Sequence, residues 1–125
     1  MPPPSSGKLQ LRPCPSSPNC VSTQAQDEQH GIAPFRYRKS HIEAKQVLKA
    51  AIGTLPRTKL VEEDDRYLHY EFTSFLFRFV DDVEFLFEED TKTLHFRSAS
   101  RIGYGDFGVN RRRMEEIRSL IQSRL

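Results

Sequence analysis

The chain has 125 residues, of which 37% are hydrophobic and 29% charged, and a formal net charge of +2. This length suffices for one domain with a modest core and is too short for two. The small net charge argues against a nucleic-acid partner, which usually requires a strong basic excess. No stretch reaches the ~18 apolar residues that a membrane span needs, so we expect a soluble protein.

The charges are segregated along the chain. Residues 1–60 and 93–125 are basic, with net charges of +6 and +4, whereas residues 61–92 carry −8. Such an order indicates segments that neutralise one another in the folded state.

Residues 1–37 hold most of the prolines and show no sustained helical or strand period. Proline removes a backbone donor and restricts the residue before it. We therefore expect an irregular arm over residues 1–37 and an α+β domain over residues 38–125. The start of the chain lacks the apolar run of a secretory signal, so we expect a cytoplasmic location.

The first predicted helix covers residues 40–52. Ser40 and Glu43 form a capping box, in which each side chain satisfies a free backbone N–H group. Gly53 and Pro56 are typical of a helix end. The apolar residues recur at helical spacing and form one stripe: Ala44, Val47, Leu48 and Ala51.

Four strands are predicted next, over residues 58–64, 67–72, 83–88 and 94–101. Apolar and polar residues alternate in the last three, as they do in half-buried strands. The connections are short, so we expect an antiparallel sheet in meander order.

The segment "SFLFRFV" (Ser74 to Val80) differs, because it is apolar on both faces. Both faces of such a segment would have to be covered by the arm, a partner subunit or a ligand. We expect coverage by the chain's own arm or loops.

The last predicted helix runs from Arg111 to Arg124 with Asn110 as its N-cap. Met114 and Ile117 belong to its apolar face. The whole order therefore predicts a four-stranded antiparallel sheet flanked by an N-terminal and a C-terminal helix.

Three motifs, in order, are "CPSSPNCVS", "FVDDVEF" and "RSASRIGYGDFGVNRRRMEEIR". In them the chain resembles a small family known as domain of unknown function 1499, found in bacteria and in plastid-bearing eukaryotes. The resemblance covers residues 12 to 122. It implies no activity, cofactor or catalytic residue.

The arginine-rich stretch suggests an anion site. All seven cations after residue 92 are arginines, whose planar fork suits a carboxylate or phosphate. Glycines let the backbone approach an anion, and a helix N-terminus attracts one. The candidate ligand-binding residues are Arg97, Arg101, Gly103, Gly105, Asp106, Gly108, Asn110 and Arg111.

A second interpretation is internal. Acids of the same chain, Asp81, Asp82 and Glu84 together with Asp106, pair with these arginines and fix the last strand, loop and helix. We favour this interpretation, and an anion pocket stays the alternative. The three glycines have the spacing of a dinucleotide fingerprint but lack its parallel β-α-β context, so we expect no cofactor.

Catalytic groups are sparse. Asp82 and Glu84 share a strand face ~7 Å apart, a spacing that suits a carboxylate pair. His69 and His95 are candidate bases, although histidines on a polar strand face are usually only solvated.

Cys14 and Cys20 enclose five residues, so a disulfide is feasible in an oxidising compartment and two thiols are expected in a reducing one. With His30 and His41 they match no common zinc spacing, and we expect no metal.

We therefore expect a non-catalytic binding module for an anionic small molecule or a protein partner. The alternatives are a hydrolase-like enzyme that uses Asp82, Glu84 or His69 beside the arginines, and a thiol redox protein.

Overall fold

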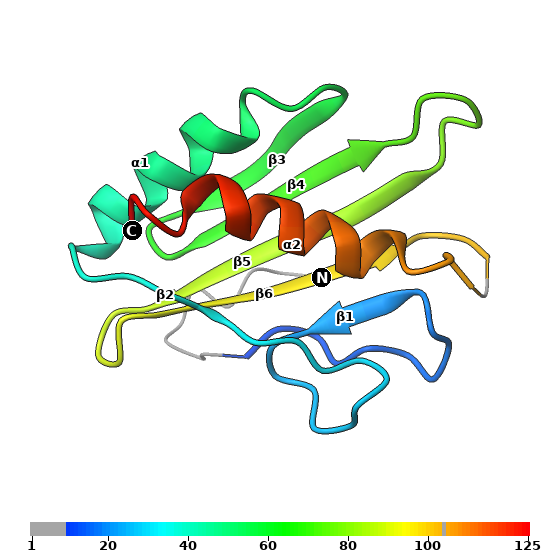
Figure 1. Ribbon diagram of the computed structural model, residues 1–125, viewed down its shortest axis with the longest axis horizontal. Coiled ribbons are helices and arrows are strands. Elements are labelled where there is room, and N and C mark those ends of the chain that lie inside the picture. The colour runs from blue at the N-terminus through cyan, green and yellow to red at the C-terminus, as the bar shows by residue number, and fades with distance from the viewer. Residues whose placement is uncertain (1–9, 104) are drawn as a thin grey trace.

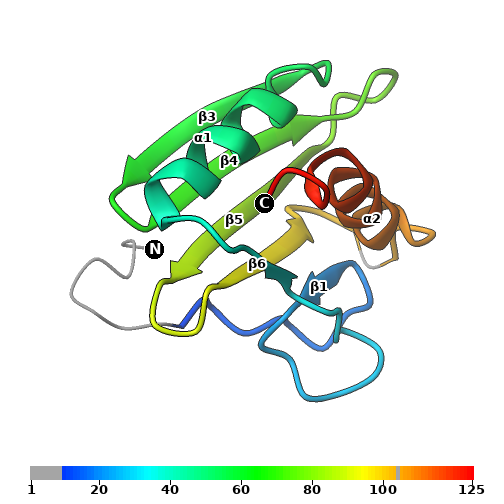
Figure 2. The ribbon, with the colours of Figure 1, turned by 60° about the vertical axis from the view of Figure 1, so that its left-hand side comes forward.

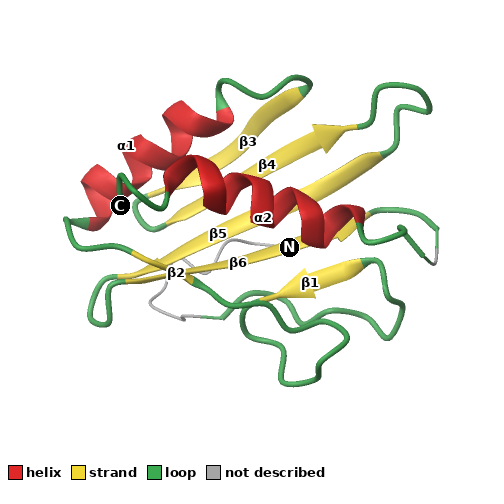
Figure 3. Ribbon diagram, viewed as in Figure 1, coloured by secondary structure: helices red, strands yellow, loops and turns green. Residues whose placement is uncertain are grey.

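The computed structural model describes residues 10–103 and 105–125. Residues 1–9 of the predicted arm lie outside that range, as does Tyr104. The described part is an α+β fold with an antiparallel sheet and two helices (Figures 1 and 3). The elements are β1 (Cys20–Ser22), β2 (Phe35–Arg36), α1 (His41–Ile52), β3 (Thr58–Asp64), β4 (Tyr67–Thr73), β5 (Val80–Glu88), β6 (Thr93–Ser100) and α2 (Val109–Ile121).

The four central strands form the predicted antiparallel meander. The register places Tyr70 opposite Val83, and Phe85 opposite Phe96. These apolar side chains point to one face of the sheet, because successive residues of a strand alternate between faces. They are buried together with Leu48 of α1 and other helical residues in the main core.

The sheet has six strands rather than the four predicted. The two additional strands come from the Pro-rich arm, and both pair with the outer edge of β6. Cys20 of β1 lies opposite Ala99, and Phe35 of β2 lies opposite Leu94. The arm is therefore not irregular throughout, because the unpaired backbone groups at the edge of β6 attract any extended segment within reach.

Both helices lie on the same face of the sheet (Figures 1 and 2). The predicted helices do not flank the sheet on two sides, because only this face is continuously apolar. The opposite face carries polar residues and is partly covered by the arm, where Leu11 packs on Tyr67 and Leu86. A disulfide between Cys14 and Cys20 ties this part of the arm to β1.

The structure confirms the first helix and corrects the second. Ser40 caps α1 by accepting a hydrogen bond of 3.2 Å from the backbone N–H of Glu43. Helix α2 begins at Val109, after Gly108 in the left-handed conformation (φ 78°), and ends at Ile121. Asn110 is thus not the N-cap. It lies in the first turn, fully buried.

The segment over residues 74–79 is the loop of the β4–β5 hairpin. The ladder between these strands ends where Thr73 lies opposite Val80. The expectation that this chain covers the segment is wrong, since Phe75, Leu76 and Phe77 are 71%, 72% and 69% exposed.

In the described part of the chain, neither helix has the length and apolarity to cross a bilayer.

Candidate functional site

The structure does not bring the three predicted anion-binding arginines together. Arg97 is buried on β6, on the face opposite the helices, with Nη1 at 3.6 Å from Oε1 of Glu84. Arg101, at the end of β6, donates to Asp82 at 2.8 Å and to Glu71. Arg111 donates instead to the backbone carbonyl oxygen of Gln29, at 3.2 Å.

The helix N-terminus of the predicted anion site is occupied by Asp106. Its carboxylate accepts hydrogen bonds from the backbone N–H groups of Gly108 (2.8 Å) and Asn110 (3.1 Å). Burial raises the pKa of Asp106, but the hydrogen bonds from Asn110 and Gly108 outweigh it, and the net shift is downward. The chain itself thus supplies an anion at this end of α2.

The glycine loop is held by the rest of the chain. The carbonyl oxygen of Gly103, whose φ is 86°, accepts a hydrogen bond of 2.8 Å from the Asn19 side chain. The Asn110 side chain donates in turn to the Asn19 carbonyl oxygen. Gly105 has open space around its Cα atom. The loop therefore joins the arm to the start of α2.

Three of the four carboxylates of β5 meet three different arginines. Asp81 accepts from Arg113 at 2.6 Å, Asp82 from Arg101, and Glu84 faces Arg97. Of the internal pairs expected from the sequence, Asp82 with Arg101 and Glu84 with Arg97 occur, whereas Asp81 meets Arg113 and Asp106 meets no arginine among the described residues.

Glu84 is 2% exposed and Arg97 6%, beneath the arm. The Tyr67 hydroxyl donates to Oε2 of Glu84. Burial, followed by the Glu84 carboxylate, raises the pKa of Tyr67. Burial lowers the pKa of Arg97, although Glu84 opposes the shift. The carboxylate of Glu84 does not reach solvent, so the predicted pair of Asp82 and Glu84 is not an open catalytic pair.

The remaining candidate bases are also hydrogen-bonded. His69 contacts Asp82 at 2.8 Å, and His95 contacts Glu88 at 3.0 Å. Burial by itself raises the pKa of Asp82, but hydrogen bonds from Arg101 and His69 hold it below its usual value.

The four residues considered for zinc do not gather around one point. Both cysteines are in the disulfide, His30 contacts Asp27, and His41 contacts Asp65. No group of His, Cys, Asp or Glu suited to a metal ion occurs among the residues that the structure describes.

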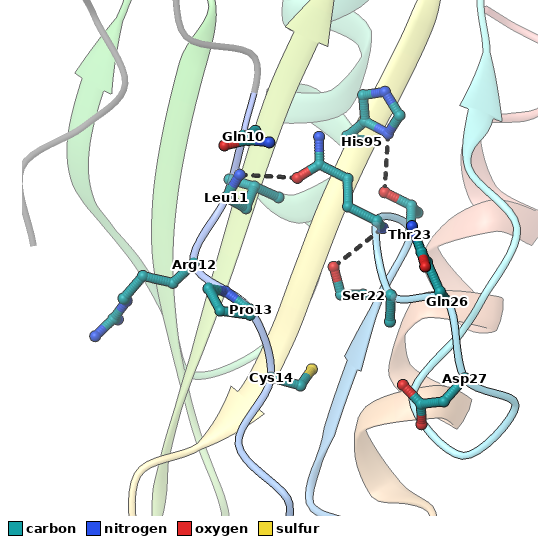
Figure 4. Close-up of a pocket in the computed structure, with 12 residues that line it drawn as sticks. Gln10, Leu11, Arg12, Pro13, Cys14, Ser22, Thr23, Gln26, Asp27 and His95 are labelled. Carbon is teal, nitrogen blue, oxygen red and sulfur yellow. Dashed lines mark hydrogen bonds between the residues drawn. The ribbon is translucent and has the colours of Figure 1, made fainter.

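A groove of about 680 Å³ lies between the arm and the loop that follows β1 (Figure 4). Its walls are formed by residues 10–14 and 22–27, with His95. Thr23 and His95 are hydrogen-bonded at 3.0 Å, and the Arg12 side chain points away from the other labelled side chains. The groove therefore lacks an inward-pointing cation.

A second groove, of about 530 Å³, lies beside the N-terminus of α2. Its apolar lining comes from Leu55, Phe72, Phe75 and Val109. Its polar lining comes from Arg57, Thr73, Ser74, Arg112, Arg113 and Glu116. Here apolar surface and arginines occur side by side.

This groove opens at one end of the domain, which we call the loop end. It consists of the α1–β3 loop (residues 53–57), the β4–β5 loop (residues 74–79) and the described residues of the β6–α2 loop (101–103 and 105–108). The last two loops project from the same end of the sheet (Figures 1 and 2). Phe107 is 96% exposed there, and Ile102 and Phe79 are also exposed.

The loop end is cationic as well as apolar. Arg57, Arg78, Arg111 and Arg112 belong to it or adjoin it. Within the described residues these four form no ion pair with a carboxylate, unlike Arg97, Arg101 and Arg113.

The backbone of the loop end is unusual too. Arg57, Arg78 and Phe107 adopt positive φ angles of 56°, 57° and 54°. Such angles are uncommon for residues other than glycine. They persist only where the surrounding structure holds them, and they cluster at functional sites.

Sequence reasoning found this surface only in part. The two apolar faces of residues 74–80 indicated an unusual segment. Because we expected the arm or loops to cover this segment, we did not predict an exposed surface there. Phe107, which lies between Asp106 and Gly108, was a second signal, since an aromatic residue in a polar, glycine-rich loop has no core to enter. Nothing local marked Arg57.

Comparison with known proteins gives a family and no close relative of known function. Neither the curated proteins nor the solved structures include a match. A family model does match, over residues 10–121, and its description is "Protein of unknown function (DUF1499)". The resemblance inferred from the three motifs is confirmed, and the chain belongs to this family.

Proposed function

We propose that this domain is a non-catalytic binding module whose loop end takes an anionic amphiphile, a molecule with an acidic head and an apolar tail. One observation carries the proposal. Arg57 and Arg112, which pair with no carboxylate of the described residues, line a groove together with apolar side chains, and the loops beside it carry exposed apolar residues. The sequence suggested an anion site at the glycine loop, and we now propose that the anionic ligand binds in the neighbouring groove.

The groove has the two kinds of surface that such a ligand needs. Phe75 and Val109, which are both exposed, offer apolar surface to a tail, and burying apolar area is the main favourable term in binding. Arg57 and Arg112 lie at the same groove and offer planar donors to a carboxylate or phosphate head.

The acids and histidines support binding rather than turnover. Asp82 is held between Arg101 and His69, and Glu84 is buried against Tyr67. A general base must reach the proton that it removes, and Glu84 has no route to a ligand in the grooves described.

The test is thermal unfolding of the chain with decyl phosphate below its micelle-forming concentration. A ligand that binds only the folded state raises the unfolding midpoint. We expect a rise with decyl phosphate and a smaller one with inorganic phosphate or decanol, because each of these lacks half of the recognised chemistry.

The double variant Arg57→Gln/Arg112→Gln should lose the rise. Arg124→Gln, at the opposite end of α2, should keep it. Equal rises for decyl phosphate and decanol would refute a role for the arginines, and no rise at all would refute the proposal.

A further inference from the structure

We infer that the loop end docks on an anionic phospholipid bilayer, with Phe75, Leu76, Phe77 and Phe107 entering its apolar interior. The inference rests on the proposed function and names the source of the amphiphile: a lipid in a membrane surface rather than a free molecule. Four lines of observation lead to it.

The first is shape. The exposed apolar side chains lie on two separate projecting loops, β4–β5 and β6–α2 (Figures 1 and 2). A rigid partner protein would need a matching hollow for each projection. The fluid acyl region of a bilayer accepts projecting side chains without one, which is how apolar residues anchor interfacial segments.

The second is the distribution of charge. Three acids near the loop end are already engaged: Asp81 by Arg113, Asp106 by backbone N–H groups, and Asp82 by Arg101. Glu116 also lines the groove, but the four arginines without an ion pair outnumber this one carboxylate. Anionic headgroups attract such arginines at the membrane surface.

The third is the contact between cations and rings. The guanidinium of Arg57 lies 5.4 Å from the centroid of the Phe75 ring, and the rings of Phe77 and Phe79 stack at 5.6 Å. Arginine can keep its head at the headgroup layer while its stem and the neighbouring ring lie deeper. This pairing suits a boundary between polar and apolar layers.

The fourth is the order of the β4–β5 loop. The Ser74 hydroxyl accepts a hydrogen bond from the Phe79 backbone N–H (2.9 Å), and the Phe79 carbonyl oxygen accepts one from the Ser74 N–H (2.9 Å). The loop is closed by these two bonds before any partner binds. Preorganisation of this kind lowers the entropic cost of docking.

A second copy of the chain is a poorer occupant. In a two-fold dimer each patch faces its own copy, so the four arginines would meet the same four arginines. A bilayer supplies the negative charge that such a dimer lacks.

The sequence contains no tryptophan, so a single introduced tryptophan reports its own surroundings. We would compare Phe77→Trp, in the β4–β5 loop, with Ile42→Trp as the matched control. Ile42 is also exposed, but it lies near the start of α1, at the opposite end of the domain (Figure 1). Each variant is mixed with phosphatidylcholine vesicles with and without phosphatidylserine, and with brominated lipid as quencher.

We expect the emission of Phe77→Trp to shift to shorter wavelength and to be quenched only with vesicles that contain phosphatidylserine. Ile42→Trp should change little. In co-sedimentation, Arg57→Gln/Arg78→Gln should weaken vesicle binding roughly tenfold or more, since each basic residue near the surface contributes to membrane affinity. High salt should weaken it too.

Thermal unfolding without lipid checks that the variants are folded. Binding of decyl phosphate monomers without binding to any vesicle would overturn this inference and leave the proposed function standing. Equal binding to neutral and anionic vesicles would overturn it as well, as would concentration-dependent dimerisation that buries Phe77→Trp in the absence of lipid. If neither decyl phosphate nor vesicles bind, both proposals fail.

Discussion

Arg113 donates a hydrogen bond of 2.6 Å to Asp81, and its guanidinium carbon lies 5.0 Å from the centroid of the Phe72 ring. This contact accounts for one member of the arginine triplet at the start of α2, where cations are locally unfavourable. The other two differ. Arg111 reaches the arm at Gln29, and Arg112 donates to the carbonyl oxygen of Phe107.

The ion pair between Arg113 and Asp81 should stabilise the fold. Its partners are mostly buried, and removal of one partner leaves the other charge uncompensated. We expect Arg113→Met to lower the free energy of unfolding by about 3 kcal/mol, measured by urea titration. Arg124→Met, an exposed change in the same region of sequence, should stay within about 0.5 kcal/mol. Equal effects of the two changes would contradict the assignment.

The Asp106 carboxylate should act as the cap of α2. Asp106→Ala removes the acceptor of two backbone N–H groups, so we expect a loss of about 1 kcal/mol in unfolding free energy. Asp90→Ala, in the exposed turn between β5 and β6, is the control. The cap assignment is wrong if chemical denaturation shows the same stability for both variants.

Glu89 should make the fold sensitive to acid. It accepts hydrogen bonds from Lys92 (2.8 Å), the Tyr37 hydroxyl (3.0 Å) and the His41 backbone N–H (3.0 Å). These contacts, that of Lys92 foremost, lower the pKa of Glu89 to about 2 from a usual value of 4.5.

Because the folded pKa is the lower one, this stabilisation is present above pH 4.5 and is lost as the pH falls toward about 2. Glu89→Gln should flatten the fall of the unfolding midpoint across that window. Glu28→Gln, an exposed change, should leave the slope as it is. An unchanged slope in Glu89→Gln would show that the contacts have no such effect.

His30 should titrate above its usual pKa of 6.5. Its ring contacts the Ser17 carbonyl oxygen at 2.8 Å and the Asp27 carboxylate at 2.6 Å, and the imidazolium form can donate to both. The contact with Ser17 is the main cause of the raised pKa, and Asp27 adds to it.

Because the pKa of His30 is raised in the folded state, the stabilisation of the fold by its charged form is complete below pH 6.5. It is lost as the pH rises through the folded pKa. Proton NMR titration of the folded chain should give a midpoint above 6.5 for His30. A midpoint at or below 6.5 would show that the contacts of His30 with Ser17 and Asp27 do not favour the charged imidazolium.

Reduction of the disulfide between Cys14 and Cys20 should destabilise the arm. The bond closes a short loop, with a sequence separation of 6, for which chain entropy gives about 2 kcal/mol. We expect Cys14→Ser/Cys20→Ser to lower the unfolding free energy by that amount. Hydrogen exchange should also become faster in residues 10–14 than in β4 and β5. If exchange rises equally everywhere, the bond stabilises the whole domain and does not specifically hold the arm.

The sequence by itself determined what depends on near neighbours. The capping box at Ser40 predicted the start of α1, and alternation predicted three of the four central strands, because both patterns are local. Family membership also followed from three motifs. In contrast, the prediction of Asn110 as N-cap failed because its side chain finds better partners from the arm and β6, at Asn19 and Ser100.

Only the tertiary structure decided the rest. Which acid each arginine meets depends on strands and loops separated by many residues, as in the pair of Arg113 with Asp81. Composition also could not show whether residues 74–79 are covered, since a buried segment and a projecting loop can have the same apolar composition. The register between β4 and β5 ends at Thr73 and Val80, and this leaves the phenylalanines of the loop exposed beside Arg57.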